Sequence, residues 1–192
     1  MINNPIVKFE RWWDEVKRIG LKHPGAVCVS TIDEQGFPSG RFVDLKDIAD
    51  DCFIFCTNLD SQKGHDIEKN DRVALTFWWE AIGYQVRIIG HASQISSEAA
   101  DRYWDTRPRD AQITTLSCQQ SKLLISEKLL QVQFEKVKAS LEGVEITRPD
   151  NWGGYAVKPV MIEFLTFKAS RLHLRERYTI VENEWSKELL QP

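Results

Sequence analysis

The stretch "AVCVSTIDEQGFPSGRFVDLK", residues 26–46, holds two runs rich in β-forming residues on either side of a short polar turn. The turn runs from Asp33 to Gly36 and contains a glycine, which is the usual signature of a β-hairpin. A hairpin joins antiparallel strands. We therefore expect an antiparallel pair of strands here.

Further strands and helices are predicted on both sides of this hairpin. Helical spacing of apolar residues predicts an amphipathic helix over 5–19, with Ile6, Phe9, Trp13 and Val16 on its buried side. A second such helix over 126–142 has Leu130, Phe134, Val137 and Leu141 as its expected buried stripe. The other expected helices are 61–70 and a segment from Ser96 or Ser97 to about Thr106; the other expected strands are 52–58, 72–79, 84–95, 155–167, 170–181 and 185–190.

The order of these elements favours one class of fold. Strands occur at both ends of the chain with helices inserted between them, and the βαβ alternation of a parallel Rossmann sheet is missing. We therefore expect a mostly antiparallel β-barrel with peripheral α-helices, an α+β protein. No repeat or linker divides the sequence, so residues 1–192 are expected to form a single domain.

Composition and charge exclude several partners. The 192 residues are 42% hydrophobic and carry a formal net charge of -3. An acidic balance argues against a general binder of nucleic acid or of membrane surfaces. The first helix contains Glu10, Asp14 and Glu15 and lacks the apolar core of a signal peptide, so a cytoplasmic location is expected.

Several kinds of catalytic site have no counterpart in the sequence. The four cysteines, at positions 28, 52, 56 and 118, form no CxxC pair and fit no zinc spacing, so they are expected to be reduced and no metal site is predicted. There is no HExxH, no Walker-type loop and no GxSxG motif.

The segment "SRLHLRERY", residues 170–178, carries an unusual run of cations. If it is one strand, its alternating side chains place Arg171, His173, Arg175 and Arg177 on the same face. Cations at this spacing repel one another, and an anion bound among them would offset the repulsion. The pattern therefore predicts an anionic ligand.

Other cations occur in segments with the character of strands or turns. Any one of them alone is more simply a solvated surface residue. Together they are typical of a cavity that holds a phosphate or a carboxylate, and amides such as Gln85 and Gln120 suit the edge of a planar heterocycle. The predicted ligand is therefore a small, phosphorylated molecule; the cations in question are Arg41, Lys46, Lys63, Arg107 and Arg109.

A set of motifs in the same order resembles the pyridoxamine 5'-phosphate oxidase family from residue 5 to the end of the chain. The motifs are "STIDEQGFPSGRFVDLK", "FIFCTNLDSQKGHDIEKNDRVAL", "YQVRIIGHA", "YWDTRPRDAQI", "QQS", "NWGGY" and "SRLHLRERY". The resemblance implies a split β-barrel that forms a homodimer, with FMN bound between the subunits. It also implies hydride transfer from C4' of pyridoxamine or pyridoxine 5'-phosphate to flavin N5, followed by reoxidation by oxygen to give hydrogen peroxide.

The resemblance also assigns residues to roles. The implied FMN contacts are Arg41, Phe42, Val43, Cys56, Thr57, Lys63, Gln85, Gln120, Ser121 and Arg175, with Arg41 and Lys63 on the phosphate. The substrate phosphate is expected to contact Lys46, Tyr103 and Arg107. Arg171 and His173 are expected over the substrate ring as the catalytic pair.

Three positions depart from the family's pattern, and other functions stay open. Gln62 stands where a second cation is usual, Ala111 where a serine helps to hold the substrate phosphate, and Leu165 where a tryptophan touches the flavin. One alternative is an FMN oxidoreductase of the same fold that acts on another substrate, such as a phenazine precursor. Another is a binder of flavin or haem without catalysis, with His173 as an axial ligand. A nucleic-acid-binding function is disfavoured by the net charge.

Overall fold

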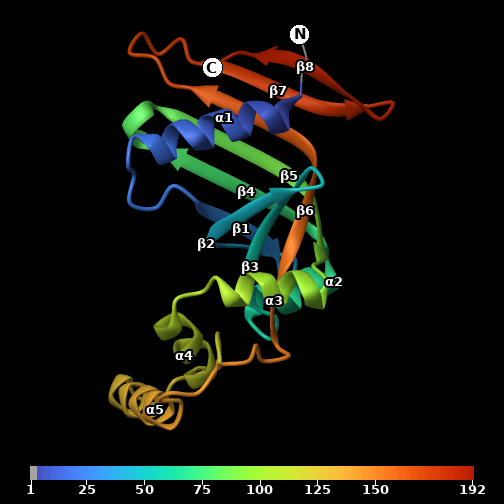
Figure 1. The fold of residues 1–192 in the computed structure, drawn as a ribbon. Coiled ribbons are helices and arrows are strands. Elements are labelled where there is room, and N and C mark those ends of the chain that lie inside the picture. Colours follow the sequence, from blue (N-terminus) through green and yellow to red (C-terminus); the bar gives the residue numbers. More distant parts are fainter. Residues whose placement is uncertain (1–3) are drawn as a thin grey trace.

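The computed structural model describes residues 4–192, and its centre is an antiparallel β-barrel (Figure 1). The strand order is β3-β2-β1-β4-β5-β6-β7-β8, and an additional pairing of β3 with β6 closes a barrel of six strands. The predicted antiparallel barrel is therefore confirmed. The strands are β1 Ala26–Ile32, β2 Pro38–Ala49, β3 Cys52–Asn58, β4 Arg72–Trp79, β5 Tyr84–Gln94, β6 Trp152–Thr166, β7 Leu174–Val181 and β8 Glu184–Leu190.

The hairpin predicted from residues 26–46 is β1 and β2. Their register runs from Ala26 opposite Asp44 to Ile32 opposite Pro38. The side chain of Asp33 accepts hydrogen bonds from the backbone N–H groups of Gln35 and Phe37, at 2.9 and 2.8 Å. An aspartate that bonds its own turn in this way fixes the reversal of the chain.

Strand β6 is long enough to join two parts of the sheet. Its first half pairs with β3 and its second half with β7, while β5 pairs with both halves. Where β3 and β6 meet, a Cβ at Gly154 would lie 2.5 Å from the carbonyl oxygen of Phe55. Barrel closure therefore requires glycine at this position.

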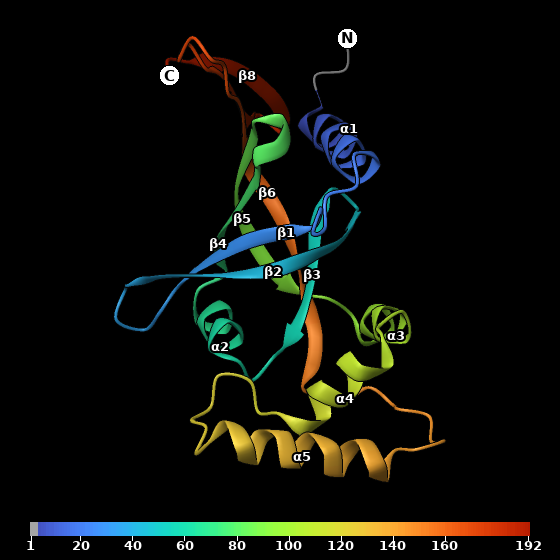
Figure 2. The ribbon, with the colours of Figure 1, turned by 90° about the vertical axis from the view of Figure 1, so that its left-hand side faces the viewer.

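Five α-helices surround the barrel: α1 Pro5–Arg18, α2 Gln62–Lys69, α3 Ser97–Asp105, α4 Arg109–Ser117 and α5 Glu127–Ser140. Helix α1 packs Phe9 edge-on against Phe53 and Phe77 in the main core, with ring centroids 4.9 Å apart in both pairs. Figure 2 shows α4 and α5 below the end of the barrel, with α2 and α3 on either side. None of the helices in residues 4–192 is long and apolar enough to cross a membrane.

Two expectations about the helices were wrong or incomplete. Helix α4 was not predicted, since the segment after Pro108 shows no clear amphipathic pattern. The stripe on α5 is only half-buried, because α5 lies outside the barrel on a smaller core of Trp104, Ile113, Ile146 and Trp152.

The strand expected over 170–181 begins only at Leu174. Residues 170–173 form a turn, and Arg171 has a left-handed backbone with φ of 66°. Arg171 and His173 therefore do not continue the strand face of Arg175, and the prediction of one cationic face was wrong for these two residues. Similarly, β6 begins at Trp152, three residues before the expected start at 155.

Candidate active site

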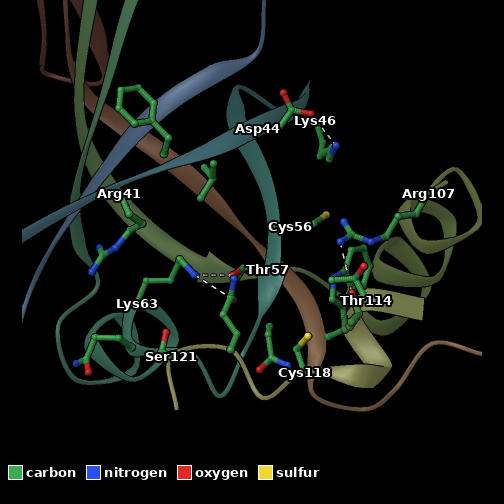
Figure 3. A pocket seen from close by; sticks show the side chains of 17 residues that line it. Arg41, Asp44, Lys46, Cys56, Thr57, Lys63, Arg107, Thr114, Cys118 and Ser121 are labelled. Atoms are coloured by element: carbon green, nitrogen blue, oxygen red, sulfur yellow. Dashed lines mark hydrogen bonds and ion pairs between the residues drawn. The ribbon is translucent and has the colours of Figure 1, made fainter. Parts of the chain in front are cut away.

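A cavity of about 600 Å³ lies at the end of the barrel between β2, β3, α2 and α4 (Figure 3). Ten of the predicted site residues line it: Arg41, Phe42, Val43, Lys46, Cys56, Thr57, Lys63, Arg107, Gln120 and Ser121. Gln62 also lines it. Segments distant in sequence therefore meet at one cavity.

Lys63 is buried at one end of this cavity, in the first turn of α2. Its ammonium group donates to Thr57 Oγ1 at 2.9 Å, Ser61 Oγ at 3.1 Å and Gln120 Oε1 at 3.2 Å. Burial, followed by repulsion from Arg41, lowers the pKa of Lys63 from 10.5 to about 8. A buried cation whose direct partners are uncharged gains from a nearby anion.

Close packing fixes the position of Lys63. A Cβ at the neighbouring Gly64 would lie 1.8 Å from the carbonyl oxygen of Leu59, so α2 approaches the preceding turn as only glycine allows. The backbone at Lys63 is therefore held against the turn that precedes α2.

Arg41 is a residue of β2. Its side chain lies beside that of Lys63 and belongs to a buried polar network. Its guanidinium donates to Thr31 Oγ1 at 2.6 Å and to Ser39 Oγ at 2.9 Å, and it lies 3.5 Å from Asp66 Oδ2. Asp66 is itself buried and accepts a hydrogen bond from Thr31 at 2.6 Å. These contacts hold the guanidinium fork in place.

Gln62 is part of the same network. Its amide donates to Asp66 Oδ1 at 2.7 Å. At this position the chain supplies no third cation, so the charge at this end of the cavity rests on Arg41 and Lys63.

The other end of the cavity holds Lys46, Cys56 and Arg107. Burial raises the pKa of the Cys56 thiol to about 11, so the thiol stays protonated near neutral pH. Tyr103 does not line the cavity but packs beside Cys56 in the smaller core, and its hydroxyl donates to Asp47 Oδ2 at 3.1 Å. The three residues expected to contact the substrate phosphate, Lys46, Tyr103 and Arg107, thus lie close to one another.

The remaining predicted site residues lie elsewhere. Gln85 on β5 pairs with Leu165 on β6, which pairs in turn with Arg175 on β7. Arg171 and His173 lie in the turn just before this row. None of Gln85, Arg171, His173 and Arg175 lines the cavity of the same chain.

The separation of the two groups follows from the register of β6. Cys56 is opposite Gly154, whereas Arg175 is opposite Leu165, eleven positions further along the strand. At about 3.3 Å per residue, this separates the groups by on the order of 30 Å. Arg175 is occupied locally, since its guanidinium donates to the buried Glu163 carboxylate at 2.8 to 2.9 Å.

Some cavity residues were not predicted from sequence. Thr114, Thr115 and Cys118 come from α4 and its end, which the sequence pattern did not reveal. Asp44 was not predicted either, since a carboxylate does not suit a cavity expected to hold an anion. An acidic residue three positions after Arg41 in a predicted strand is a signal that could have identified it.

The two anchoring cations and the enclosed volume fit a small anionic cofactor. A phosphate suits a fixed guanidinium fork beside a lysine, and its charge would offset the burial and the repulsion from Arg41 that lower the pKa of Lys63. Fold and cavity together define a split-barrel protein with a site suited to a phosphorylated ligand.

The comparisons with known proteins identify the family. Residues 13–140 match the family described as "Pyridoxamine 5'-phosphate oxidase", and residues 152–192 match "Pyridoxine 5'-phosphate oxidase C-terminal dimerisation region". The chain therefore belongs to the pyridoxamine 5'-phosphate oxidase family, which consists of FMN-dependent oxidoreductases.

Individual relatives agree with this assignment. The chain is 44% identical to "Pyridoxine/pyridoxamine 5'-phosphate oxidase 2" of Hydrogenovibrio crunogenus, over 99% of this chain and 89% of that protein. It is 39% identical to the oxidase of Leptospira biflexa, over 98% and 89%. Among solved structures, PhzG from Burkholderia lata, in complex with tetrahydrophenazine-1-carboxylic acid, has a TM-score of 0.93 at 28% identity, covering 98% of this chain and 93% of that one.

Proposed function

We propose that this protein is an FMN-dependent oxidase of pyridoxamine or pyridoxine 5'-phosphate. The observation that carries the proposal is the pair of buried or half-buried cations, Arg41 and Lys63, at one end of a cavity whose other end holds Lys46 and Arg107. One end suits the phosphate of FMN and the other the anionic group of a substrate. Bound flavin would supply the redox chemistry by accepting hydride from substrate C4', with oxygen as the final acceptor and hydrogen peroxide as the product.

The residues of the chain bind and orient in this proposal. Arg41 and Lys63 hold the cofactor phosphate, and the amide of Gln120 and the hydroxyl of Thr57 line the same end of the cavity. Lys46 and Arg107 hold the substrate anion, with Tyr103 behind them. No nucleophile or metal is needed for this reaction.

We also propose that the active form is a homodimer with FMN between the subunits. The four predicted residues at the far end of the sheet cannot reach the cavity of their own chain, and residues 152–192 match a dimerisation region. A second copy would bring its Gln85, Arg171, His173 and Arg175 to the cavity. Symmetry would then make two equivalent sites.

Incubating FMN-loaded protein with pyridoxamine 5'-phosphate, pyridoxine 5'-phosphate and their unphosphorylated forms tests the function directly. We expect peroxide and the corresponding aldehyde in equal amounts. An absorption spectrum is measured first, because a flavin spectrum supports the proposal and a sharp Soret band supports a haem binder. Protein that binds FMN yet oxidises none of these compounds would overturn the assigned substrate.

A second candidate is an oxidase of the same fold whose substrate carries a carboxylate. Tetrahydrophenazine-1-carboxylic acid is bound in the similar PhzG structure. In this chain, the position of the missing serine is Ala111, in the first turn of α4. The absence of that hydroxyl weakens the case for a phosphate at this end of the cavity.

We predict that FMN affinity falls as pH rises through about 8. The pKa of Lys63 is near 8 in the free protein, so the lysine is mostly charged at pH 7 and mostly neutral at pH 9. If only the charged form holds the phosphate, binding is about tenfold weaker at pH 9 than at pH 7. The measurement is quenching of FMN fluorescence at both pH values.

The same pKa shift has the opposite effect on the free protein. Unfolded Lys63 binds its proton more tightly than folded Lys63, so the free energy of unfolding should rise between pH 8 and 10.5.

The control for the FMN measurement is a Lys63→Met variant. It should bind FMN weakly, and its FMN affinity should not fall as the pH rises through about 8. If the variant keeps the wild-type pH dependence, another group is responsible.

We predict that Ala111→Ser lowers KM for pyridoxamine 5'-phosphate by about tenfold, since a hydroxyl adds one donor to a charged acceptor. The gain is smaller if a water molecule already makes this contact. The turnover number should change little, because the phosphate is remote from the reacting carbon. Steady-state kinetics of both proteins provide the measurement.

Ala139→Ser, on the exposed surface of α5, is the matched control for a serine in a helix. It should leave KM unchanged. An unchanged or raised KM in Ala111→Ser would mean that no phosphate lies beside α4, and the carboxylate-bearing substrate would then become the better candidate.

A further inference from the structure

Two carboxylates flank Lys46 at the substrate end of the cavity. Asp44 lines the cavity, and its Oδ2 lies 2.7 Å from the ammonium group of Lys46. Asp47 is the next residue along β2, and its Oδ2 accepts the hydrogen bond from Tyr103. Both acids therefore contact residues that are expected to hold the substrate anion.

The backbone of β2 brings these acids together. The register between β2 and β3 shifts between Leu45 and Asp47, so Lys46 lies at a β-bulge. A bulge interrupts the strict alternation of side chains and redirects those next to it. Asp44 and Lys46 stay on one face, while Asp47 turns toward Tyr103 on α3.

The two acids alter what Lys46 and Tyr103 can offer a ligand. The charge of Lys46 is compensated by Asp44, and the hydroxyl proton of Tyr103 is already shared with Asp47. Burial, together with the charge of Asp47, raises the pKa of Tyr103 to about 12, so the phenol remains a donor. A ligand anion must displace a carboxylate from each group or accept its repulsion.

Arg107 is differently placed. Its Nε is buried and has no hydrogen-bond partner anywhere in residues 4–192, and its Nη2 makes only a long bond of 3.4 Å to Thr115. The guanidinium lies over the ring of Trp152, 5.4 Å from the centroid. A buried donor without a partner is costly, so this guanidinium favours an anion in the cavity.

We propose that Asp44 and Asp47 determine the charge selectivity of this site, because their carboxylates reduce the advantage that a phosphate dianion has over a singly charged anion held by Arg107. Resting on the proposed function, this inference names its specificity-determining residues. Lys46, Arg107 and Asp44 line this end of the cavity, and Asp47 lies next to them along β2, so two carboxylates balance the two cations. A dianion is repelled twice as strongly by Asp44 as a singly charged group in the same place.

The test compares ligands with FMN-loaded wild-type protein and an Asp44→Asn variant. Asparagine has nearly the shape of aspartate but no charge. Calorimetry gives the dissociation constants of pyridoxal 5'-phosphate, unphosphorylated pyridoxal and phenazine-1-carboxylate. Asp50→Asn, in the exposed turn after β2, is the control for removing an acid from the same region.

We expect Asp44→Asn to lower the dissociation constant of pyridoxal 5'-phosphate by about three- to tenfold. The dissociation constant of phenazine-1-carboxylate should fall by less, and that of pyridoxal by less than about twofold. Asp47→Asn should act in the same direction but more weakly, since its amide oxygen still accepts from Tyr103. Asp50→Asn should change none of the three.

Two results would overturn the inference, and they differ in meaning. If pyridoxal 5'-phosphate and pyridoxal bind but their affinity ratio is the same in wild type and Asp44→Asn, the inference alone fails. If neither compound nor the carboxylate binds to any variant, the proposed function fails and the inference fails with it.

Discussion

Replacing Arg41 with alanine is expected to raise the dissociation constant of FMN by about ten- to a hundredfold. A hydrogen bond to a charged acceptor contributes roughly 1.5–3 kcal/mol, and Arg41 is one of the two cations at the cofactor end of the cavity. The guanidinium is already held by Thr31 and Ser39, so little ordering is needed when the phosphate binds. Fluorescence quenching of FMN during titration provides the measurement.

The controls separate lost binding from lost folding. Truncation leaves the buried Asp66 without its nearest cation, so the thermal midpoint of the free variant must be measured as well. Arg41→Lys keeps the charge without the fork and should bind with intermediate affinity. Arg11→Ala, on the exposed side of α1, should change nothing. Wild-type affinity in Arg41→Ala would remove Arg41 from the phosphate site.

The local structure around Arg41 and Lys63 was predictable because both residues belong to strong local patterns. Arg41 lies in a hairpin marked by a glycine turn, and Lys63 lies in the first turn of a helix, just after its N-cap residue. In both cases backbone preferences and hydrophobic alternation favour the same structure. The arrangement of these elements in space is then set by closure of the barrel at Gly154, where β3 and β6 pair.

The segment 170–178 shows where such patterns fail. Arg171, His173 and Arg175 alternate as in a strand, yet the chain turns at Arg171 and the strand starts at Leu174. Alternation describes which side chains would share a face if the strand formed. It contains no information about where backbone pairing with β6 begins, which here is Thr166 opposite Leu174.

The distance between the cavity and the predicted residues at the far end of the sheet was also beyond local pattern. The sequence placed cations in several segments, but only the register of β6 shows that Cys56 and Arg175 are eleven positions apart along one strand. A resemblance to a dimeric family supplied the explanation that spacing could not. The consequence is a prediction about mixtures of two variants.

Arg171→Ala is expected to lower turnover by at least about a hundredfold, while the affinity for FMN stays near that of the wild type. A cation aimed at the reacting group typically contributes effects of this size. Arg171 is exposed in the single chain and alanine adopts a left-handed backbone no more easily than arginine, so folding should be little affected. Steady-state kinetics at saturating FMN give the measurement, and near-normal turnover would remove Arg171 from the reaction.

Mixing the Arg171→Ala and Arg41→Ala chains, assayed at an FMN concentration that saturates the wild type but leaves Arg41→Ala sites largely empty, then tests whether each site uses both subunits. In a mixed dimer, one site combines both defects, whereas the other combines an intact Arg41 from one chain with an intact Arg171 from its partner. Random reassociation makes half of the dimers mixed, so about a quarter of the wild-type activity should return. If each site is built within one chain, every site in the mixture carries one defect and no activity returns. Recovery is therefore possible only if the far end of the sheet serves the cavity of the other subunit, as we propose.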